Sequence, residues 1–91
     1  MTILAWSDEK NELVKDKTGV SFEDIEQALA EGKQLADILN PNKKKYGHQR
    51  IMIVDIRGYA YAVPYVRQDD GSFFLKTLYP CRKYKQLYLD S

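Results

Sequence analysis

Basic and aromatic side chains concentrate in the second half of the chain. Residues 41–91 carry ten Lys and Arg against four Asp, whereas residues 1–40 carry nine Asp and Glu against four Lys. All seven tyrosines also lie in residues 41–91. Cations interleaved with aromatic rings suit a polyanion with phosphates and stackable bases, which is RNA. The alternative is a solvated sheet surface, because Lys and Arg are common on the outer face of any strand.

The reactive side chains exclude most metal-dependent and nucleophilic catalysis. One His and one Cys are too few for a zinc site, and neither Cys-x-x-Cys nor His-Glu-x-x-His occurs. The five glycines are isolated, so there is no Gly-rich phosphate loop, and Gly-x-Ser-x-Gly is missing. We therefore expect no metal and no cofactor. The chemistry that remains is cleavage of RNA through its own 2′-hydroxyl, which needs a base, an acid and cations around the phosphate.

One side chain has an ordinary pKa that suits proton transfer near neutral pH. This is His48, which lies beside Arg50 in a basic loop formed by residues 43–49. The alternative is an ordinary exposed loop histidine. In that case Lys or Tyr must act, with Tyr84 and Tyr88 as the phenolic candidates. The pKa values of both residue types lie about three units too high unless neighbouring cations shift them.

Length and composition predict one folded domain. A chain of 91 residues with 44% hydrophobic and 12% aromatic residues has enough apolar surface for one core. The longest apolar runs, such as residues 51–54, are far too short to cross a bilayer. We expect no secretory signal, because the first residues lack a basic segment and a long apolar segment. A single cysteine, Cys81, cannot form an internal disulfide, so the expected compartment is the cytoplasm.

The first forty residues predict two helices and a strand. Ser7 is expected to cap a helix that runs to about Lys17 and stops at Gly19, with Leu13 and Val14 as its apolar face. Ser21 caps a second helix, with an acid three residues later as in a capping box, and residue 32 ends it. A helical repeat of apolar residues predicts its buried stripe, which consists of Phe22, Ile25, Ala28 and Leu29. Residues 34–39 are expected to form a short strand.

The second half predicts a sheet and a terminal helix. Strands are expected over residues 50–57, 59–67 and 72–79, with turns at Gly58 and at 68–71, a short strand over 2–6, and a helix over 81–89. Along the second run, Tyr59, Tyr61 and Tyr65 share one face with Val63 and Arg67, and small residues share the other. Pro64 predicts an edge or a bulge.

These elements predict an α+β fold. Two N-terminal helices would pack on one face of an antiparallel sheet of about four strands, with a short C-terminal helix. The other face would present tyrosines and basic residues to solvent. Within the C-terminal helix, Leu87 and Tyr88 are expected to pack back on the sheet.

Two N-terminal segments resemble the opening of the BrnT-like toxins. They are residues 6–11 (Trp-Ser-Asp-Glu-Lys-Asn) and 19–24 (Gly-Val-Ser-Phe-Glu-Asp). The similarity continues at Arg50, at 65–67 (Tyr-Val-Arg) and at 81–83 (Cys-Arg-Lys), and so spans most of the chain. The chain departs from the family at Thr18, which replaces a histidine, at the Lys run 43–45, and at residues 80–81 (Pro-Cys).

The resemblance implies a RelE-like fold and the activity of a metal-independent endoribonuclease. Such proteins are toxins of type II toxin–antitoxin pairs. The implied partners are an RNA substrate and a cognate ribbon-helix-helix antitoxin, with operator DNA bound only through the antitoxin and no membrane. The alternative is a non-catalytic RNA- or protein-binding module on the same fold. A third hypothesis is a structural interaction domain whose tyrosine-rich face is a protein interface.

Four residues are the predicted catalytic set, namely Arg82, His48, Arg67 and Arg50. Arg82 matches the family's C-terminal arginine, and a guanidinium is a planar donor that stays charged at the scissile phosphate. Arg67 and Arg50 would position phosphates, and the alternative for each is a cross-strand ion pair, for example with Asp55 or Asp69. The predicted RNA-binding side chains are Lys10, Lys43, Lys44, Lys45, Lys76, Lys83 and Tyr84.

Overall fold

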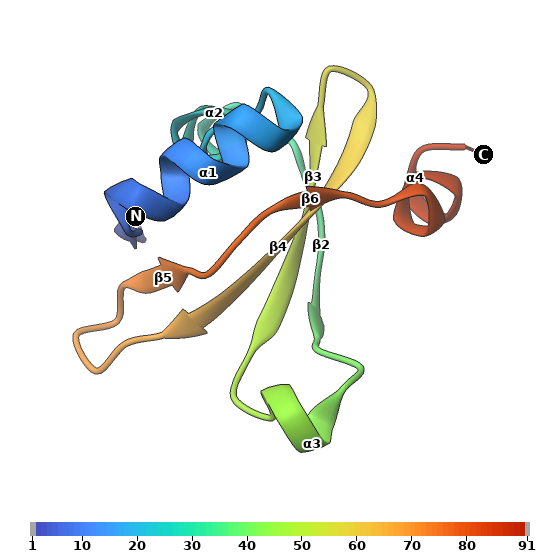
Figure 1. The fold of residues 1–91 in the computed structure, drawn as a ribbon. Coiled ribbons are helices and arrows are strands. Elements are labelled where there is room, and N and C mark those ends of the chain that lie inside the picture. The colour runs from blue at the N-terminus through green and yellow to red at the C-terminus, as the bar shows by residue number, and fades with distance from the viewer. Residues whose placement is uncertain (1, 91) are drawn as a thin grey trace.

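The computed structural model describes residues 2–90, which form four helices and a mixed sheet of six strands (Figure 1). The helices are α1 (Asp8–Thr18), α2 (Phe22–Ala30), α3 (Lys43–Tyr46) and α4 (Arg82–Tyr88). The strands are β1 (Leu4–Ala5), β2 (Gln34–Leu39), β3 (Arg50–Ile56), β4 (Tyr59–Arg67), β5 (Phe73–Leu75) and β6 (Tyr79–Pro80). The α+β class is therefore confirmed. No helix within residues 2–90 is long and apolar enough to cross a membrane.

The sheet differs from the expected antiparallel sheet of about four strands. Its order is β1-β5-β4-β3-β2, with β6 also paired to β4. The two-residue strand β1 runs parallel to β5, whereas the other pairings are antiparallel. The run 72–79, which we expected to be one strand, is divided into β5 and β6 because the chain leaves the ladder at residues 76–78. The strand count was therefore too low.

Pro64 lies where β4 changes partner. On that edge, Tyr65 to Arg67 pair with β5, and Tyr61 and Ala62 pair with β6. The carbonyl of Pro64 accepts a hydrogen bond from the Lys76 N–H at 2.8 Å. In a strand, the N–H and C=O of one residue point to the same side. The N–H that proline lacks would therefore point toward the gap between β5 and β6 and away from β3. The hydrogen bonds between β3 and β4 are thus kept. The expected irregularity at proline thus takes the form of a break between two short partner strands.

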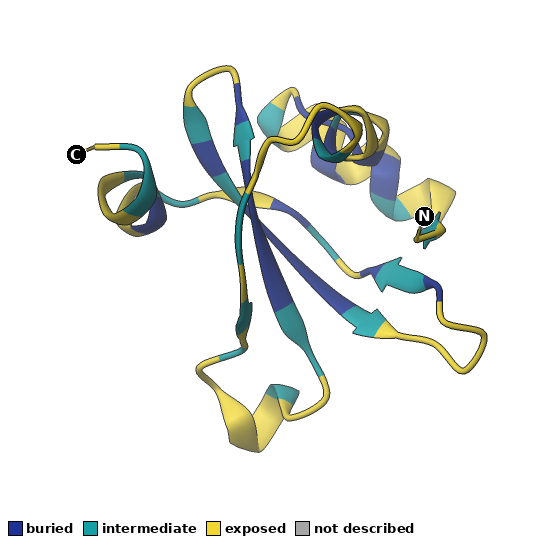
Figure 2. Ribbon diagram, turned by 180° about the vertical axis from the view of Figure 1, so that it is seen from behind, coloured by how far each residue is buried: buried dark blue, intermediate teal, exposed yellow. Residues whose placement is uncertain are grey.

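The helices cover both faces of the sheet, and the expectation that they share one face was wrong. One core cluster contains Val14, Phe22 and Ile25 of α1 and α2 together with Val54 and Val63 of the sheet. The other cluster joins Tyr84 of α4 to residues on the opposite face, among them Ile53 and Ala62. Figure 1 shows α1 and α2 on one side of the strands and α4 on the other, and Figure 2 shows the buried residues concentrated between them.

The face of β4 that carries tyrosines packs in part against the core under α1 and α2. Tyr65 is 1% exposed, and Tyr61 packs against the same core. The opposite face carries Ala60 and Ala62, both fully buried under α4. The physical reason is side-chain volume, because alanines let the aromatic side chain of Tyr84 approach the strand closely. Tyr59 and Tyr61 stay partly exposed, so the tyrosine-rich surface that we expected on this strand is open to solvent only in part.

The ends of α1 and α2 agree with the sequence. The Ser7 hydroxyl accepts the Lys10 N–H at 3.3 Å, and Gly19 adopts a left-handed φ of 79°. Ser21 and Asp24 form the reciprocal capping box, with distances of 3.2 and 2.9 Å. These local hydrogen bonds satisfy backbone groups that a helix end leaves without partners.

Asn11, rather than Leu13, joins Val14 on the buried side of α1. Its amide group donates to Glu23 at 2.6 Å and accepts the Phe22 N–H at 2.8 Å, and so ties α1 to the start of α2. Leu13 is 56% exposed, so its expected burial was wrong. An amide that bonds two groups of the neighbouring helix compensates for its own burial, which a purely apolar pattern does not reveal.

Two further expectations are corrected near α3 and α4. Residues 43–49 were expected to form a loop, but Lys43 to Tyr46 form a turn of helix capped by Asn42, whose side chain accepts the Lys45 N–H at 3.2 Å. On α4, Leu87 is 64% exposed, whereas Tyr88 packs against the second core cluster as expected. A seven-residue helix presents one side to the sheet, and Leu87 lies off that side.

Candidate nucleic-acid interface

Arg50 takes part in a polar network across three adjacent strands. Its Nε lies 2.8 Å from Oδ1 of Asp37 on β2, and its Nη2 donates to the Asp37 carbonyl at 3.2 Å. The hydroxyl of Tyr65 on β4 donates to Oδ2 of the same carboxylate at 2.5 Å. The hydrogen bonds and charge of Asp37 raise the pKa of Arg50. The cross-strand ion pair considered for Arg50 is therefore present, although its partner is Asp37 instead of Asp55 or Asp69.

Replacing Tyr65 by phenylalanine should weaken the loss of stability at alkaline pH. Burial, and then the Asp37 carboxylate, raise the pKa of Tyr65 to about 12. The unfolded chain ionises this phenol near pH 10. The contribution of Tyr65 is therefore fully present below about pH 10, and it is lost as the pH rises from about 10 to about 12. Urea unfolding across this range measures it. Tyr88→Phe on α4 is the control, and an equal change in both variants would contradict the assignment.

The structure separates Arg82 from the rest of the predicted catalytic set. Arg50 and Arg67 lie on one face near the same end of β3 and β4, because Arg50 pairs with Tyr65, two residues before Arg67. The Cys81 N–H bonds to Ala60, which places Arg82 beside the start of β4, whereas Arg67 ends that strand. Seven strand residues separate these points, or about 23 Å. Arg82 also begins α4, on the face of the sheet opposite to the Arg50 network. Arg67 is exposed, with its guanidinium carbon 5.5 Å from the centroid of the Phe73 ring, and His48 is exposed in the connection after α3.

Several of the predicted RNA-binding residues, in contrast, come together in one cavity of about 550 Å³, which we call the β6 cleft. Lys10 of α1, Lys76 in the connection between β5 and β6, and Tyr84 of α4 line it. The buried cross-strand pair Ile51 and Pro64 forms its floor. The cleft lies where residues 76–78 leave the sheet opposite Pro64, next to the part of the sheet that α4 covers.

The lining of the β6 cleft combines ammonium groups, phenols and amides. Tyr46 and Tyr79 join Tyr84 as aromatic side chains, and the amide side chains are Asn40, Asn42 and Gln49. Ion pairs within residues 2–90 join Arg50 to Asp37 and Lys85 to Asp90, so Lys10 and Lys76 have no ion-pair partner in that part of the chain. Lys76 Nζ lies 5.5 Å from the centroid of the Phe74 ring. Unpaired ammonium groups next to aromatic rings suit phosphates next to bases.

Two phenols of the cleft, those of Tyr79 and Tyr84, are protonated at neutral pH. Burial raises the pKa of both Tyr79 and Tyr84, and the neighbouring Cys81 raises it further. Each hydroxyl is therefore a hydrogen-bond donor or acceptor and not a base. The lining of the cleft also lacks histidine. The cleft is thus better equipped to bind a strand than to remove a proton from it.

The remaining predicted RNA-binding lysines lie on α3 and α4 and do not line the cleft. Lys43, Lys44 and Lys45 belong to α3, whose last residue Tyr46 and N-cap Asn42 line the cavity, and Lys45 Nζ lies 5.2 Å from the centroid of the Tyr46 ring. Lys83 is exposed on α4, next to Tyr84. Sequence reasoning missed Tyr46 and Tyr79. Tyr46 directly follows three lysines, and this neighbourhood could have marked it as an RNA-binding residue. Tyr79 gave no such signal, because the sequence predicts it within a regular strand.

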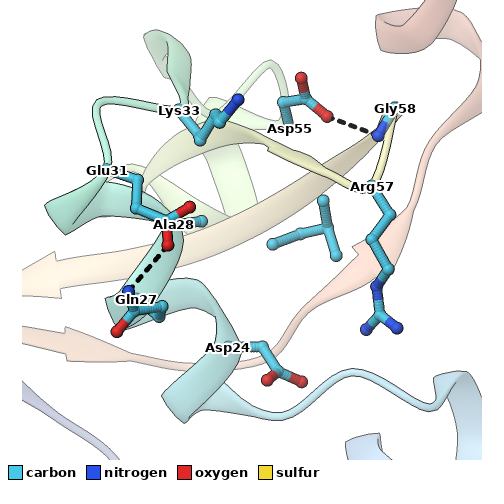
Figure 3. A pocket seen from close by; sticks show the side chains of 9 residues that line it. Asp24, Gln27, Ala28, Glu31, Lys33, Asp55, Arg57 and Gly58 are labelled. Atoms are coloured by element: carbon cyan, nitrogen blue, oxygen red, sulfur yellow. Dashed lines mark hydrogen bonds between the residues drawn. The ribbon is translucent and has the colours of Figure 1, made fainter.

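A second cavity of similar size, about 530 Å³, lies between α2 and the turn joining β3 to β4 (Figure 3). Several of its polar side chains already serve local structure. Asp55 accepts the Gly58 N–H at 2.8 Å within the turn, and Gln27 donates to Glu31 at 2.8 Å along α2. In the part of the chain that the structure describes, no group of three or more His, Cys, Asp or Glu is placed to hold a metal ion. The two cavities have similar volumes, so it is the chemistry of the lining residues that favours the β6 cleft as the candidate binding site.

Comparisons of the chain with protein-family models, with curated proteins and with solved structures found no match. The β6 cleft is the feature in which the predicted chemistry and the tertiary structure agree.

Proposed function

We propose that this chain binds single-stranded RNA in the β6 cleft. The observation that carries the proposal is the convergence of Lys10 and Lys76, which have no ion-pair partner within residues 2–90, with the rings of Tyr46, Tyr79 and Tyr84. The ammonium groups would contact phosphates, and the rings would stack on bases. Stacking requires bases that are not already paired and stacked in a duplex, so a single strand or a loop is the expected ligand.

We further propose that the chain is a BrnT-like toxin on a RelE-like arrangement, with RNA cleavage as its activity. Lys10 supports this proposal, because it belongs both to the N-terminal segment that resembles the family and to the β6 cleft. The partners would then be a ribbon-helix-helix antitoxin and, through it, operator DNA. The separation of Arg82 from Arg67 and Arg50 favours binding without cleavage, so the two activities need separate tests.

Binding is tested by fluorescence anisotropy with a labelled RNA of about ten nucleotides, within the site sizes known for single-strand binders. We expect salt-dependent binding, and about tenfold weaker binding of the same sequence as a duplex, since stacking contributes about 1–3 kcal/mol per base. Equal or tighter binding of the duplex would contradict the proposal, because it would indicate attraction to charge alone.

Cleavage is tested by induced expression in a bacterial host, with growth and total RNA followed in wild type and in Arg82→Ala. Growth arrest with RNA fragmentation, both lost in the variant, would support a toxin in which Arg82 contacts the scissile phosphate. Fragmentation that continues unchanged in Arg82→Ala would overturn the role of Arg82. Intact RNA and normal growth with wild type, combined with RNA binding in vitro, would support the non-catalytic module.

A further inference from the structure

We propose that an RNA strand bound in the β6 cleft continues along α1 through an adjoining cavity, which we call the α1 groove, with Lys10 at the junction. This inference rests on the proposed RNA binding and extends it from a single pocket to a track. The α1 groove has a volume of about 520 Å³ and lies between α1 and residues 77–79. Its α1 side chains include Lys10, Leu13 and Lys17.

The two cavities adjoin each other. Lys10, Thr77 and Tyr79 line both of them. The Tyr79 ring, 40% exposed, therefore borders both spaces, and the ammonium of Lys10 can serve a phosphate that passes from one to the other. A polymer that occupies the β6 cleft has a direct exit into the groove.

The spacing of side chains along α1 suits such a strand. Lys10, Leu13 and Lys17 follow the i, i+3, i+7 pattern of one helix face. The two lysines lie about 10 Å apart along the axis, at 1.5 Å per residue. Phosphates of one duplex strand advance about 3.4 Å each, and an unstacked strand advances further, so this distance corresponds to about one to three nucleotides. Leu13, 56% exposed between them, provides an apolar surface for a base.

One lining residue opposes a phosphate. Asp16 also borders the groove, and no cation within residues 2–90 is paired with it. Its carboxylate would repel a strand that Lys17 attracts. The same path therefore predicts effects of opposite sign at two adjacent positions, which a general effect of net charge does not.

The test compares RNAs of increasing length with four charge variants of α1. Lys17→Gln should lower the affinity of RNAs long enough to leave the β6 cleft by about two- to fivefold, the contribution of one exposed ion pair, whereas Asp16→Asn should raise it by a similar factor. The matched controls, Lys15→Gln and Glu12→Gln, change charge on exposed residues of the same helix that line neither cavity. The shortest RNAs should be unaffected by all four variants.

Two outcomes would overturn the track. One is an equal effect of Lys17→Gln and Lys15→Gln, and the other is an effect that does not depend on RNA length. If either occurs while Lys76→Ala still weakens binding, the proposed function remains and only the continuation along α1 is wrong. If the wild-type protein itself does not bind RNA, the proposed function is rejected instead. Thermal unfolding of each variant verifies that the exposed substitutions leave the fold intact.

Discussion

The double variant Lys10→Ala/Lys76→Ala should bind single-stranded RNA about 10- to 30-fold more weakly than wild type. Each lysine lines the β6 cleft, and neither is ion-paired within residues 2–90, so each is available to a phosphate. At up to about 1 kcal/mol per contact, two lost contacts account for this change. Released counterions also set the salt dependence, so the slope of log K against log salt should fall by about 0.7 per lysine. Anisotropy titrations at several salt concentrations measure both quantities.

A control with the same change in charge separates the cleft from net charge. Lys15→Ala/Lys33→Ala removes two exposed lysines that lie outside the β6 cleft. We expect its affinity and salt slope to remain close to those of wild type. A loss equal to that of the cleft variant would mean that RNA is held by the overall charge of the protein, and the cleft would lose its assigned role.

Phe22→Ala should be the most destabilising substitution considered for this chain. The Phe22 side chain is completely buried at the start of α2, and its ring centroid lies 5.7 Å from that of Trp6. Truncation of a buried phenylalanine leaves a cavity and costs about 3–5 kcal/mol. The entire free energy of unfolding of a domain of this size is about 5–14 kcal/mol. At about 4–8 °C per kcal/mol, the melting temperature should fall by roughly 12–40 °C.

Circular dichroism and the fluorescence of Trp6 follow this unfolding, since Trp6 packs against Phe22. Leu13→Ala is the control, because it removes an exposed apolar side chain from the neighbouring helix and should change the free energy of unfolding by less than about 0.5 kcal/mol. A cost below about 1 kcal/mol for Phe22→Ala would mean that α2 does not dock through this ring.

Local structure follows from the sequence because its causes lie within a few residues. The N-caps at Ser7 and Ser21, the capping-box partner Asp24 and the left-handed Gly19 each involve hydrogen bonds or φ angles over three or four positions. These features were predicted correctly, as were β2, the hairpin of β3 and β4, and α4. Buried stripes repeat at helical spacing for the same reason.

The faces of the sheet were not decided by the sequence. Alternation along β4 separates Tyr61, Val63 and Tyr65 from Ala60 and Ala62, but both sets are apolar enough to be buried. Which helix covers which set depends on volume. The aromatic side fills the wide space under α1 and α2, whereas the alanines admit α4. Such complementarity exists only between elements far apart in the chain.

For the candidate site, too, part was predictable from the sequence and part was decided by the tertiary structure. The sequence determined the chemistry, because charge and aromatic content selected Lys76 and Tyr84 for RNA, and the family resemblance added Lys10. Tertiary structure determined which residues act together. Asp37 lies thirteen residues before Arg50, and only the register of β2 with β3 brings them into contact. The cleft where Lys10, Lys76 and Tyr84 meet lies at the break opposite Pro64. Residue types are local properties, whereas a cavity is a property of the packing of distant segments, and for that reason only the folded chain could define it.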